Sequence, residues 1–513
     1  MIQVPAFGEK EYFDTQMKRN ARVVLLPQAE ASRFADYCGL LEQEGFAQKE
    51  RRSEPYGEYA AFYKDGWGVF VNYFANSREL QLVMEENTKK FSYEDACGEP
   101  RVAPQVSQLK LRDYGMTYVI RLSDGRFLVI DSGRSFVEDA QRLFACLKAG
   151  SPDEKPVIAA WVFTHAHSDH IYGFFTFWER HGGEVSIEKM LFCFPDPWDM
   201  DHYPAMEKPA WEYPGKTGNE KLQDFLDLVD RQGIPVYAPH TGQVYPVGDT
   251  QLLFLTGMED TIHCAKDVNA TSLAFSMELA GQKILWTGDS RFSDARFSKR
   301  YGTSLKADIL QVPHHGFGSG TAEEQITAYE LIRPRVCLLP ASNREAFTTF
   351  SAFRPGTEYL MTQMDIEELI VGDDDRTLTL PYTPHPYGKE ELAKRYRRGR
   401  DDAGARTWVF MGLDTAVPED TLFTVLNMAH LPAEITAELF LGGESKGVRK
   451  VKLTATKRTF SVVNCFQSAE DPNESCDQAN IPENTPFCVR FFCSIPVVIS
   501  HSRCKEAYRS SEI

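Results

Sequence analysis

Alternating hydrophobic and polar stretches divide the chain into several regions. In the largest, residues 106–383, short apolar runs rich in β-branched and aromatic residues follow one another along the chain. Stretches with apolar residues at helical spacing separate some of these runs, among them FVEDAQRLFACLKAG and EKLQDFLDLVDRQG. So many strands with interleaved helices predict two sheets covered by helices, which is a layered α/β arrangement.

The regions on either side have simpler patterns. Residues 1–100 contain one amphipathic stretch, ASRFADYCGLLEQEGF, and two aromatic runs joined by the hairpin-turn sequence KDGW, which predicts a small α+β module with an aromatic core. Residues 384–406 hold a charge run with a basic middle and predict a linker with an exposed helix. Residues 407–513 contain short β-like runs such as LFTVLNM and predict a β-rich accessory domain.

Composition and charge are those of an ordinary globular protein. Hydrophobic residues make up 42% and charged residues 25% of the 513 residues, a length that favours several domains. The formal charge of −17 argues against a general attraction to nucleic acid or anionic lipid, although it leaves room for a local basic groove. The start of the chain has no signal-peptide pattern, and no apolar run is long enough to cross a bilayer, so we expect a cytoplasmic protein.

Three histidines and one aspartate are crowded into THAHSDH, directly after the apolar run VIAAWVF. A strand that ends in polar residues presents them at the edge of its sheet, where binding groups commonly lie. His165 and His167 can converge on one metal ion, and Asp169 and His170 face a neighbouring position. Imidazole and carboxylate are ligands for zinc, manganese and iron. The alternative, a histidine-rich surface loop, fits four such residues after a buried strand poorly.

Further strand ends carry residues that complete such a site. Asp289 follows the run KILWTG, and His314 with His315 follows ADILQVP. Asp131 follows RFLVI and is the right type to support a metal-binding loop through hydrogen bonds. Each residue alone is explained as a helix cap or a loop residue. Together, several strand ends rich in metal-binding groups favour a metal site.

The motifs IDSG, THAHSDH, WTGDS and VPHHG, in this order, resemble those of the metallo-β-lactamase-fold hydrolases. The resemblance covers the middle region and implies a four-layer αββα sandwich with metals at the edge of the paired sheets. From NATSLAF to LKADILQVPHHG the chain is most similar to the branch that includes the metallo-hydrolase domain of DNA-uptake competence proteins. Their membrane part has no counterpart here, and Phe317 stands where that branch usually has serine.

The resemblance also implies a role for each motif residue. The residues implied to bind a first ion are His165, His167 and, as a candidate third ligand, His263. Those implied to bind a second ion are Asp169, His170 and one of His314 and His315. Asp289 would bridge the ions, and Asp131 would support them. Asp169 and His315 are the catalytic candidates, because Asp169 can also orient a nucleophile or shuttle a proton and the histidine that binds no metal can contact the substrate.

Such a site predicts a hydrolase with two divalent ions, zinc first and manganese or iron as alternatives, that uses a metal-bridging hydroxide. The competence-type resemblance favours a phosphodiester or another phosphorylated compound as substrate. Carboxylic esters, lactones or amides are the alternative. An extended nucleic acid fits the net charge only if basic residues near the motifs, such as Arg296 and Arg300, line the pocket. A non-catalytic metal-binding interaction protein is a third hypothesis, which the intact ligand set argues against.

Overall fold

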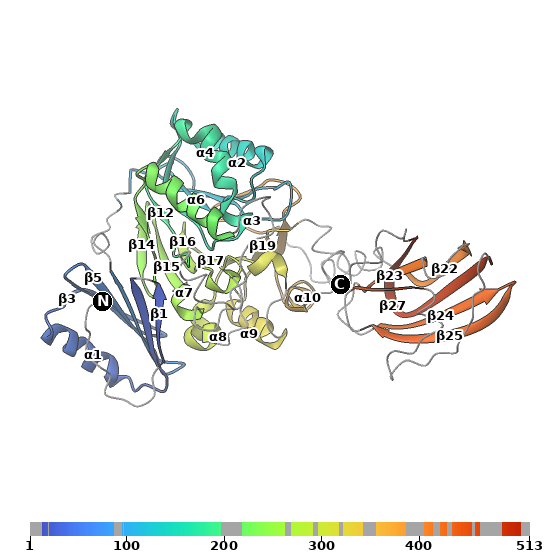
Figure 1. The fold of residues 1–513 in the computed structure, drawn as a ribbon. Coiled ribbons are helices and arrows are strands. Elements are labelled where there is room, and N and C mark those ends of the chain that lie inside the picture. Colours follow the sequence, from blue (N-terminus) through green and yellow to red (C-terminus); the bar gives the residue numbers. More distant parts are fainter. Residues whose placement is uncertain are drawn as a thin grey trace. The chain divides into compact units, whose positions relative to one another are not determined.

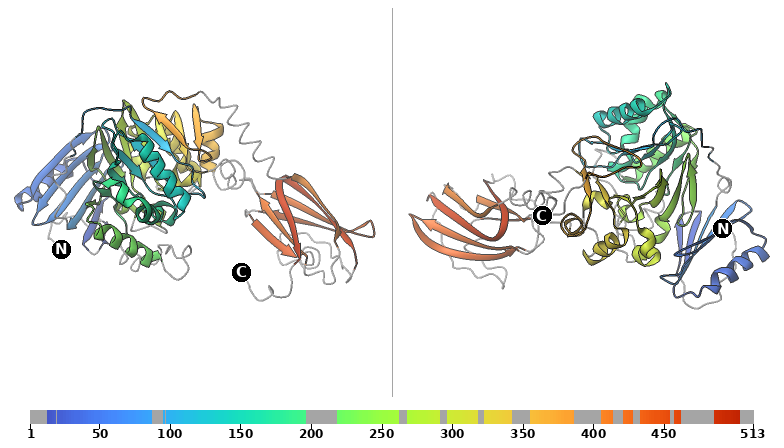
Figure 2. Two further views of the ribbon diagram at one scale, coloured as in Figure 1. Left: turned by 90° about the horizontal axis from the view of Figure 1, so that it is seen from above. Right: turned by 180° about the vertical axis from the view of Figure 1, so that it is seen from behind.

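In the computed structural model the chain forms two compact units (Figures 1 and 2). One comprises Met1–Ser342 with Met364–Gly388, and the other comprises Asn343–Gln363 with Lys389–Ile513. The structure describes residues 13–18, 20–86, 95, 97–195, 218–261, 268–290, 296–317, 322–341, 355–385, 405–413, 421–427, 433–453, 457–461 and 485–503.

The first unit begins with a six-stranded antiparallel sheet, the N-terminal sheet (Figure 2). Its strands run in the order β1 (Phe13–Lys18), β2 (Ala21–Leu26), β6 (Glu79–Glu86), β5 (Trp67–Phe74), β4 (Gly57–Lys64) and β3 (Ala47–Glu54). The apolar side of α1 (Ser32–Gln43) packs on one face. The predicted hairpin joins β4 to β5, because Asp65 and Gly66 take the positive φ angles, 49° and 84°, that a two-residue turn requires.

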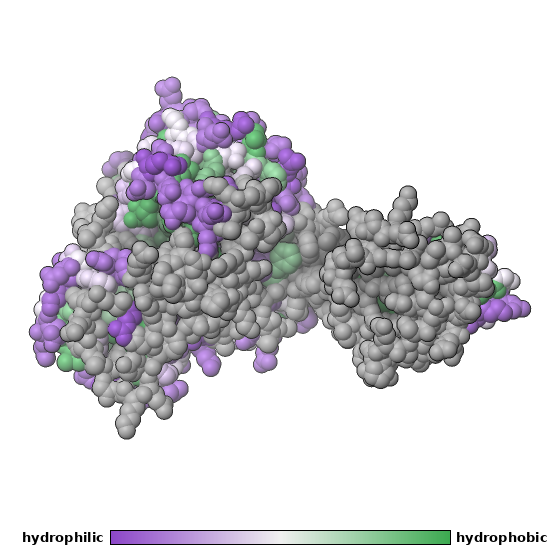
Figure 3. Space-filling view, viewed as in Figure 1, coloured by the Kyte–Doolittle hydropathy of each residue, from purple (hydrophilic) through white to green (hydrophobic). Residues whose placement is uncertain are grey.

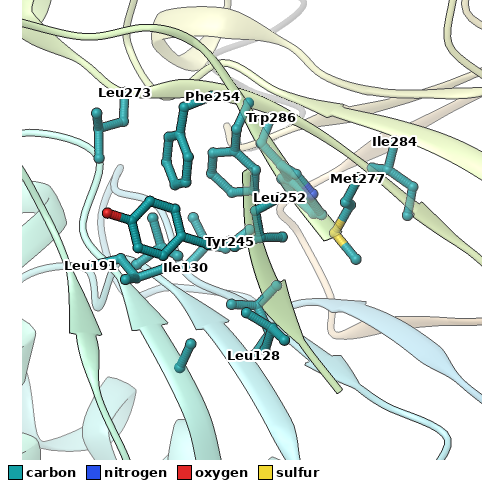
Figure 4. Close-up of a cluster of buried hydrophobic side chains, with 14 of the residues drawn as sticks. Leu128, Ile130, Leu191, Tyr245, Leu252, Phe254, Leu273, Met277, Ile284 and Trp286 are labelled. Atoms are coloured by element: carbon teal, nitrogen blue, oxygen red, sulfur yellow. The ribbon is translucent and has the colours of Figure 1, made fainter. Parts of the chain in front are cut away.

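Two further sheets of this unit pack face to face and form a sandwich. The first sheet has the order β13 (Val236–Tyr237), β12 (Met190–Leu191), β10 (Val157–Val162), β9 (Phe127–Ile130), β8 (Tyr118–Arg121), β7 (Gln105–Gln108) and β21 (Arg376–Thr379), and β11 (Ser186–Ile187) also pairs with β10. The second has the order β14 (Val244–Val247), β15 (Thr250–Thr256), β16 (Ala274–Leu279), β17 (Gln282–Trp286), β18 (Ile309–Gln311), β19 (Val336–Leu339) and β20 (Glu368–Val371). Figure 4 shows their common core, in which Leu128 and Ile130 of the first sheet face Phe254 and Trp286 of the second.

Helices cover the sandwich and complete the predicted four-layer αββα arrangement (Figure 1). On the outer face of the first sheet, α2 (Val137–Gly150), α4 (Gly173–His181) and α6 (Gly218–Arg231) bury apolar side chains. Beside the second sheet lie α8 (Arg296–Tyr301) and α9 (Ala322–Ile332). The short 3-10 helices η1 (Gly182–Glu184) and η3 (Gly302–Leu305) follow α4 and α8. The described surface in Figure 3 is largely hydrophilic, as expected for an exposed helical layer.

Buried polar contacts join the N-terminal sheet to the sandwich. Asn72 Nδ2 donates a hydrogen bond to the Thr241 carbonyl oxygen at 2.9 Å, and Arg300 Nε donates to Glu79 Oε2 at 2.8 Å. Arg296 Nε lies 3.5 Å from Glu79 Oε1. Arg296 and Arg300, which the sequence offered as charge for a nucleic acid, therefore pair with a carboxylate of the N-terminal sheet.

The second unit is β-rich, as predicted for the C-terminal region. Its sheet has the order β25 (Glu444–Leu453), β24 (Ala433–Leu441), β27 (Phe487–Arg503), β23 (Thr421–Asn427) and β26 (Lys457–Ser461), with β22 (Ala405–Leu413) on β27. The unit also contains α10 (Pro355–Thr362). Phe423, Val489 and Phe491 belong to its core. The basic helix predicted within residues 384–406 falls on positions outside the described residues. Among the described helices, none has the length and apolar character needed to span a membrane.

Candidate metal centre

The motif residues meet because each follows a strand that ends at the same edge of the sandwich. In the first sheet, Asp131 follows β9 and His165 lies just beyond β10, which is parallel to β9. In the second sheet, Asp289 and His315 lie just beyond the parallel strands β17 and β18. The carboxyl ends of parallel strands share one sheet edge, where ligands of α/β proteins commonly bind. Leu273 N donates to the Thr164 carbonyl oxygen at 2.9 Å and connects the two edges.

Unusual backbone conformations shape the loops at this edge. Within η4 (Pro313–Gly316), His314 and His315 both have a φ of 51°, in the left-handed region. Gly288 has a φ of 53°, and a Cβ atom there would lie 2.8 Å from Thr164 Cβ. A glycine is therefore required for the WTGDS loop to approach the THAHSDH loop. The short helix α3 (Ser168–Ile171) begins directly after His167 and carries the last two motif residues.

Four buried side chains converge at the centre of the edge, and we call them the four-residue cluster. They are Asp169, His170, Asp289 and His315, and one ligand atom of each lies within 4.8 Å of the others. Asp289 Oδ2 is 3.2 Å from His170 Nε2 and 3.3 Å from His315 Nε2. Asp169 Oδ2 is 3.2 Å from His315 Nε2. Carboxylate and imidazole atoms thus surround one point.

A second pair of histidines extends the cluster. His165 Nε2 lies 3.9 Å from Asp289 Oδ2 and 3.1 Å from His167 Nδ1. Asp289 therefore stands between this pair and the histidines of the four-residue cluster. The candidate third ligand of the pair, His263, lies outside the described residues.

The donor atoms fit a divalent metal ion. Among the described residues, three buried atoms of the cluster make no hydrogen bond: His170 Nε2, His315 Nε2 and Asp289 Oδ1. Both nitrogens nevertheless lie close to Asp289 Oδ2. Buried polar atoms are costly unless a partner satisfies them. Imidazole nitrogens and carboxylate oxygens around one point are the ligands of zinc, manganese and iron sites.

Hydrogen bonds on the far side of two rings fix their orientation. Asp131 Oδ2 lies 2.7 Å from His170 Nδ1, and the same carboxylate accepts bonds from Thr164 N and Oγ1, both at 2.7 Å. His315 Nδ1 donates to the Pro340 carbonyl oxygen at 2.9 Å. A proton held on Nδ1 leaves Nε2 of each ring as the ligand atom, which is the usual arrangement of metal-binding histidines. Asp131 thus contacts the His170 ring on the side that faces away from the four-residue cluster.

The electrostatic surroundings divide the four histidines into two pairs. Burial, and then the charge of His170, lowers the pKa of His165, and burial lowers the pKa of His167. Burial also acts to lower the pKa of His170 and His315, but the neighbouring carboxylates, Asp289 foremost, outweigh it and raise the pKa, to about 10 for His315. The site therefore combines neutral imidazoles with a position where carboxylates attract positive charge, as a cation site requires.

The carboxylates of the cluster respond in the opposite sense. Burial acts to raise the pKa of Asp169 and Asp289, but the neighbouring imidazoles of His170 and then His315 outweigh it and hold both pKa values below the ordinary range. Both carboxylates are therefore ionised at neutral pH and suited to bind a cation.

Asn269 is a neighbour of the site that the motif analysis did not single out. It lies in η2 (Val268–Thr271), and its Nδ2 is 3.2 Å from His314 Nε2. It also lies next to the His167 side chain, and its buried Oδ1 makes no hydrogen bond among the described residues. His314 therefore faces Asn269, and His315 is the member of the pair that joins the four-residue cluster. In the sequence, Asn269 belongs to the NATSL stretch before β16. Its place beside the histidines depends on a tertiary contact, which the sequence alone does not reveal.

The chain is similar to a known superfamily and to several solved structures. Residues 112–323 match the sequence model of the metallo-beta-lactamase superfamily. Among the similar solved structures is CmlA, a diiron beta-hydroxylase from Streptomyces venezuelae, with 11% identity, 55% of either chain covered and a TM-score of 0.33. The flavodiiron protein from Giardia intestinalis has 13% identity, with 59% of this chain and 60% of that chain covered and a TM-score of 0.24. A metallo-beta-lactamase from Staphylococcus aureus has 13% identity, with 45% of this chain and 50% of that chain covered and a TM-score of 0.21. The chain spans 55% of the length of CmlA. No curated protein matches it. Residues 112–323 thus form a domain of the metallo-beta-lactamase superfamily.

Proposed function

We propose that the protein is a hydrolase that uses two divalent metal ions, zinc in the first place, and acts on a phosphodiester or another phosphorylated compound. The observation that carries the proposal is the convergence of Asp169, His170, Asp289 and His315 within 4.8 Å, with His165 and His167 beside Asp289. The superfamily match supports a metal-dependent reaction. The likeness of the later motifs to those of the competence-type branch supports a phosphodiester.

Two groups of side chains would hold the two ions. His170, His315 and Asp169 would bind one, and His165 with His167 would bind the other, with Asp289 between them. The carbonyl oxygen of Asn269 is a candidate third ligand beside these two histidines, in addition to His263. Asn269 lies next to His167, and among the described residues its Oδ1 makes no hydrogen bond. When bound, the ions supply Lewis acidity and lower the pKa of a water molecule toward neutrality.

Asp169 is suited to proton transfer. Its side chain is 10% exposed, whereas the His170 side chain is completely buried, so solvent reaches Asp169 more readily than His170. One oxygen faces His315, and a carboxylate at such a position can orient an attacking water molecule and accept its proton. The ring of Phe317 contacts His314 and His315 at centroid distances of 5.5 and 6.5 Å and limits the space on this side.

A cation beside the centre favours an anionic substrate. The Arg134 guanidinium lies over the Tyr114 ring at 4.1 Å, and this ring packs against His315 at a centroid distance of 5.8 Å. Arg134 Nη1 also lies 3.9 Å from Asp113 Oδ2. A guanidinium forms strong paired hydrogen bonds with phosphate oxygens. Arg134 therefore supports a phosphorylated substrate over a neutral ester.

The test measures metal content and turnover on the same sample. Elemental mass spectrometry should find at least two ions per chain, as a dinuclear site requires. Bis-p-nitrophenyl phosphate should be hydrolysed by the wild type and by His181→Ala, a matched control on α4 whose ring pairs with Glu184 away from the centre. His315→Ala should abolish turnover. Hydrolysis of p-nitrophenyl acetate alone would favour the carboxylic ester alternative. Absence of both stoichiometric metal and turnover would favour the interaction-protein hypothesis and refute the proposal.

A further inference from the structure

A second group of metal-binding side chains lies in the first unit, apart from the candidate metal centre. Cys193, His240 and Glu259 are buried, with exposed fractions of 1%, 0% and 1%. One ligand atom from each lies within 4.8 Å of the others. None of the three belongs to the motifs that build the candidate metal centre. We call these residues the Cys–His–Glu cluster.

The fold brings this cluster together in the same way as the candidate metal centre. Cys193 lies just beyond β12 and His240 just beyond β13, and both strands are parallel to β10 in the first sheet. Glu259 lies in α7 (Met258–Thr261), which follows β15 of the second sheet. The cluster therefore occupies the same strand-end edge, displaced toward β13.

The hydrogen bonds of His240 select one nitrogen for a ligand. Its Nε2 lies 2.6 Å from Glu85 Oε2, on β6 of the N-terminal sheet, and its Nδ1 lies 3.5 Å from Glu259 Oε2. A proton held between Nε2 and Glu85 leaves Nδ1 on the side of Glu259. A carboxylate on the far nitrogen is the common arrangement of zinc-binding histidines. Thr241 N donates to Glu259 Oε1 at 2.5 Å and holds that carboxylate in place.

We infer that Cys193, His240 and Glu259 bind a divalent transition-metal ion, zinc by the chemistry of the ligands, and that Glu85 orients His240 for this role. Thiolate, imidazole and carboxylate are the ligand types of zinc, and a thiolate disfavours magnesium and calcium. Binding of the ion releases the thiol proton and any proton on Nδ1, which offsets the charge brought into the buried cluster. Because Glu85 reaches the cluster from β6, the ion stabilises the contact between the N-terminal sheet and the sandwich.

Cobalt(II) spectroscopy tests this inference independently of the proposed hydrolase activity. The candidate metal centre contains no cysteine among its described residues, so a thiolate-to-cobalt charge-transfer absorption reports on the second site. We expect this absorption in the full chain loaded with cobalt and in His315→Ala. Cys193→Ser should lack it. Cys337→Ser, at a buried thiol of β19, is the matched control and should keep it.

Two further variants keep the inference testable if Cys193→Ser does not fold. Glu259→Gln leaves the thiol in place but removes a charged ligand, and should weaken cobalt binding in the same assay. Glu85→Gln leaves all three ligands and should weaken binding by roughly 10–100-fold, the usual effect of losing a carboxylate that orients a ligand. The inference is overturned if the wild type shows no thiolate absorption with excess cobalt, or if Cys193→Ser retains it.

Discussion

Replacement of Asp131 by asparagine should weaken metal binding without disturbing the backbone. Asp131 is completely buried and has a φ of 53°. Asparagine adopts this left-handed conformation as readily as aspartate, so the substitution adds no backbone strain. Its oxygen can still accept the bond from Thr164 N. Its amide, however, would donate to His170 Nδ1, where the carboxylate accepts a proton, and the ring would then carry its proton on Nε2, the nitrogen that faces the cluster.

The size of the effect follows from the bonds that change. Loss of a hydrogen bond to a charged group costs about 1.5–3 kcal/mol. Here Asp131 Oδ2 loses two such bonds, from His170 Nδ1 and from Thr164 Oγ1, each at 2.7 Å. Substitution of a residue that orients a metal ligand typically lowers metal affinity or activity by about 10–100-fold. We therefore expect the affinity for one of the two ions to fall by that factor, while the ion beside His165 and His167 is less affected.

The assay is a competitive titration of metal-depleted protein with a chromogenic zinc chelator, combined with thermal unfolding. Asp124→Asn is a matched control, because Asp124 is also buried and accepts bonds from Arg126 N, Arg126 Nε and Gly98 N, but lies in the turn between β8 and β9 at the other end of the strand. It should lower stability and leave zinc affinity unchanged. Wild-type zinc affinity in Asp131→Asn, or an equal loss in both variants, would contradict the role assigned to Asp131.

Three other outcomes are expected. Gly288→Ala should destabilise the protein by about 1–3 kcal/mol in chemical unfolding and reduce bound metal, because Gly288 has a φ of 53° and lies close to Thr164. Gly281→Ala is the control: Gly281 has a φ of 76° but lies in open space, so this variant should keep its metal. Arg134→Ala should lower kcat/KM for a phosphodiester about tenfold or more and should change kcat/KM for p-nitrophenyl acetate little. The control Arg142→Ala should change kcat/KM for neither substrate. Equal losses for both substrates in Arg134→Ala would contradict phosphate recognition. Burial raises the pKa of Asp139 to about 6, above its unfolded value of about 3.9, so its stabilising contribution is complete below about pH 3.9 and is lost as the pH rises through 6. Asp139→Asn should therefore gain stability relative to the wild type as the pH rises over this range. A constant difference in unfolding free energy between the two proteins would show the reasoning to be wrong.

Much of the candidate metal centre could be predicted because its residues follow apolar strand runs directly. Asp131, His165 and Asp289 each stand just past the end of a strand, and parallel pairing brings such ends to one edge. The choice between His314 and His315 could not be predicted, because it depends on the left-handed turn that directs one ring to the cluster and the other to Asn269. The four-layer sandwich was also predictable, because each of its strands and helices has its own local pattern of apolar residues in the sequence.

The Cys–His–Glu cluster had no comparable signal in the sequence. Cys193 and His240 also follow strands, but 46 positions separate them, and Glu85 and Glu259 come from other elements without a motif. Arg296 and Arg300 illustrate the same difficulty. Their closeness to the WTGDS motif in the sequence suggested a role at the substrate, whereas their partner, Glu79, lies in the N-terminal sheet more than 200 positions earlier.

Asp260 explains why the N-terminal sheet and the sandwich behave as one unit. Its Oδ1 accepts hydrogen bonds from Gln81 Nε2 of the N-terminal sheet and from Arg300 Nη1, and its Oδ2 accepts from Thr241 Oγ1 at 2.6 Å. The charge of Arg300 and these bonds lower the pKa of Asp260 to about 2 against the effect of burial, so the carboxylate stays ionised in the interior. Removing one partner of a buried ion pair costs about 3–5 kcal/mol, because it leaves the other charge unpaired. Separation of the N-terminal sheet from the sandwich would break two ion pairs at once, Glu79 with Arg300 and Glu85 with His240. The N-terminal sheet is therefore a structural part of the metal-binding unit, and the position of Glu259 next to Asp260 in α7 links the second cluster to the same network.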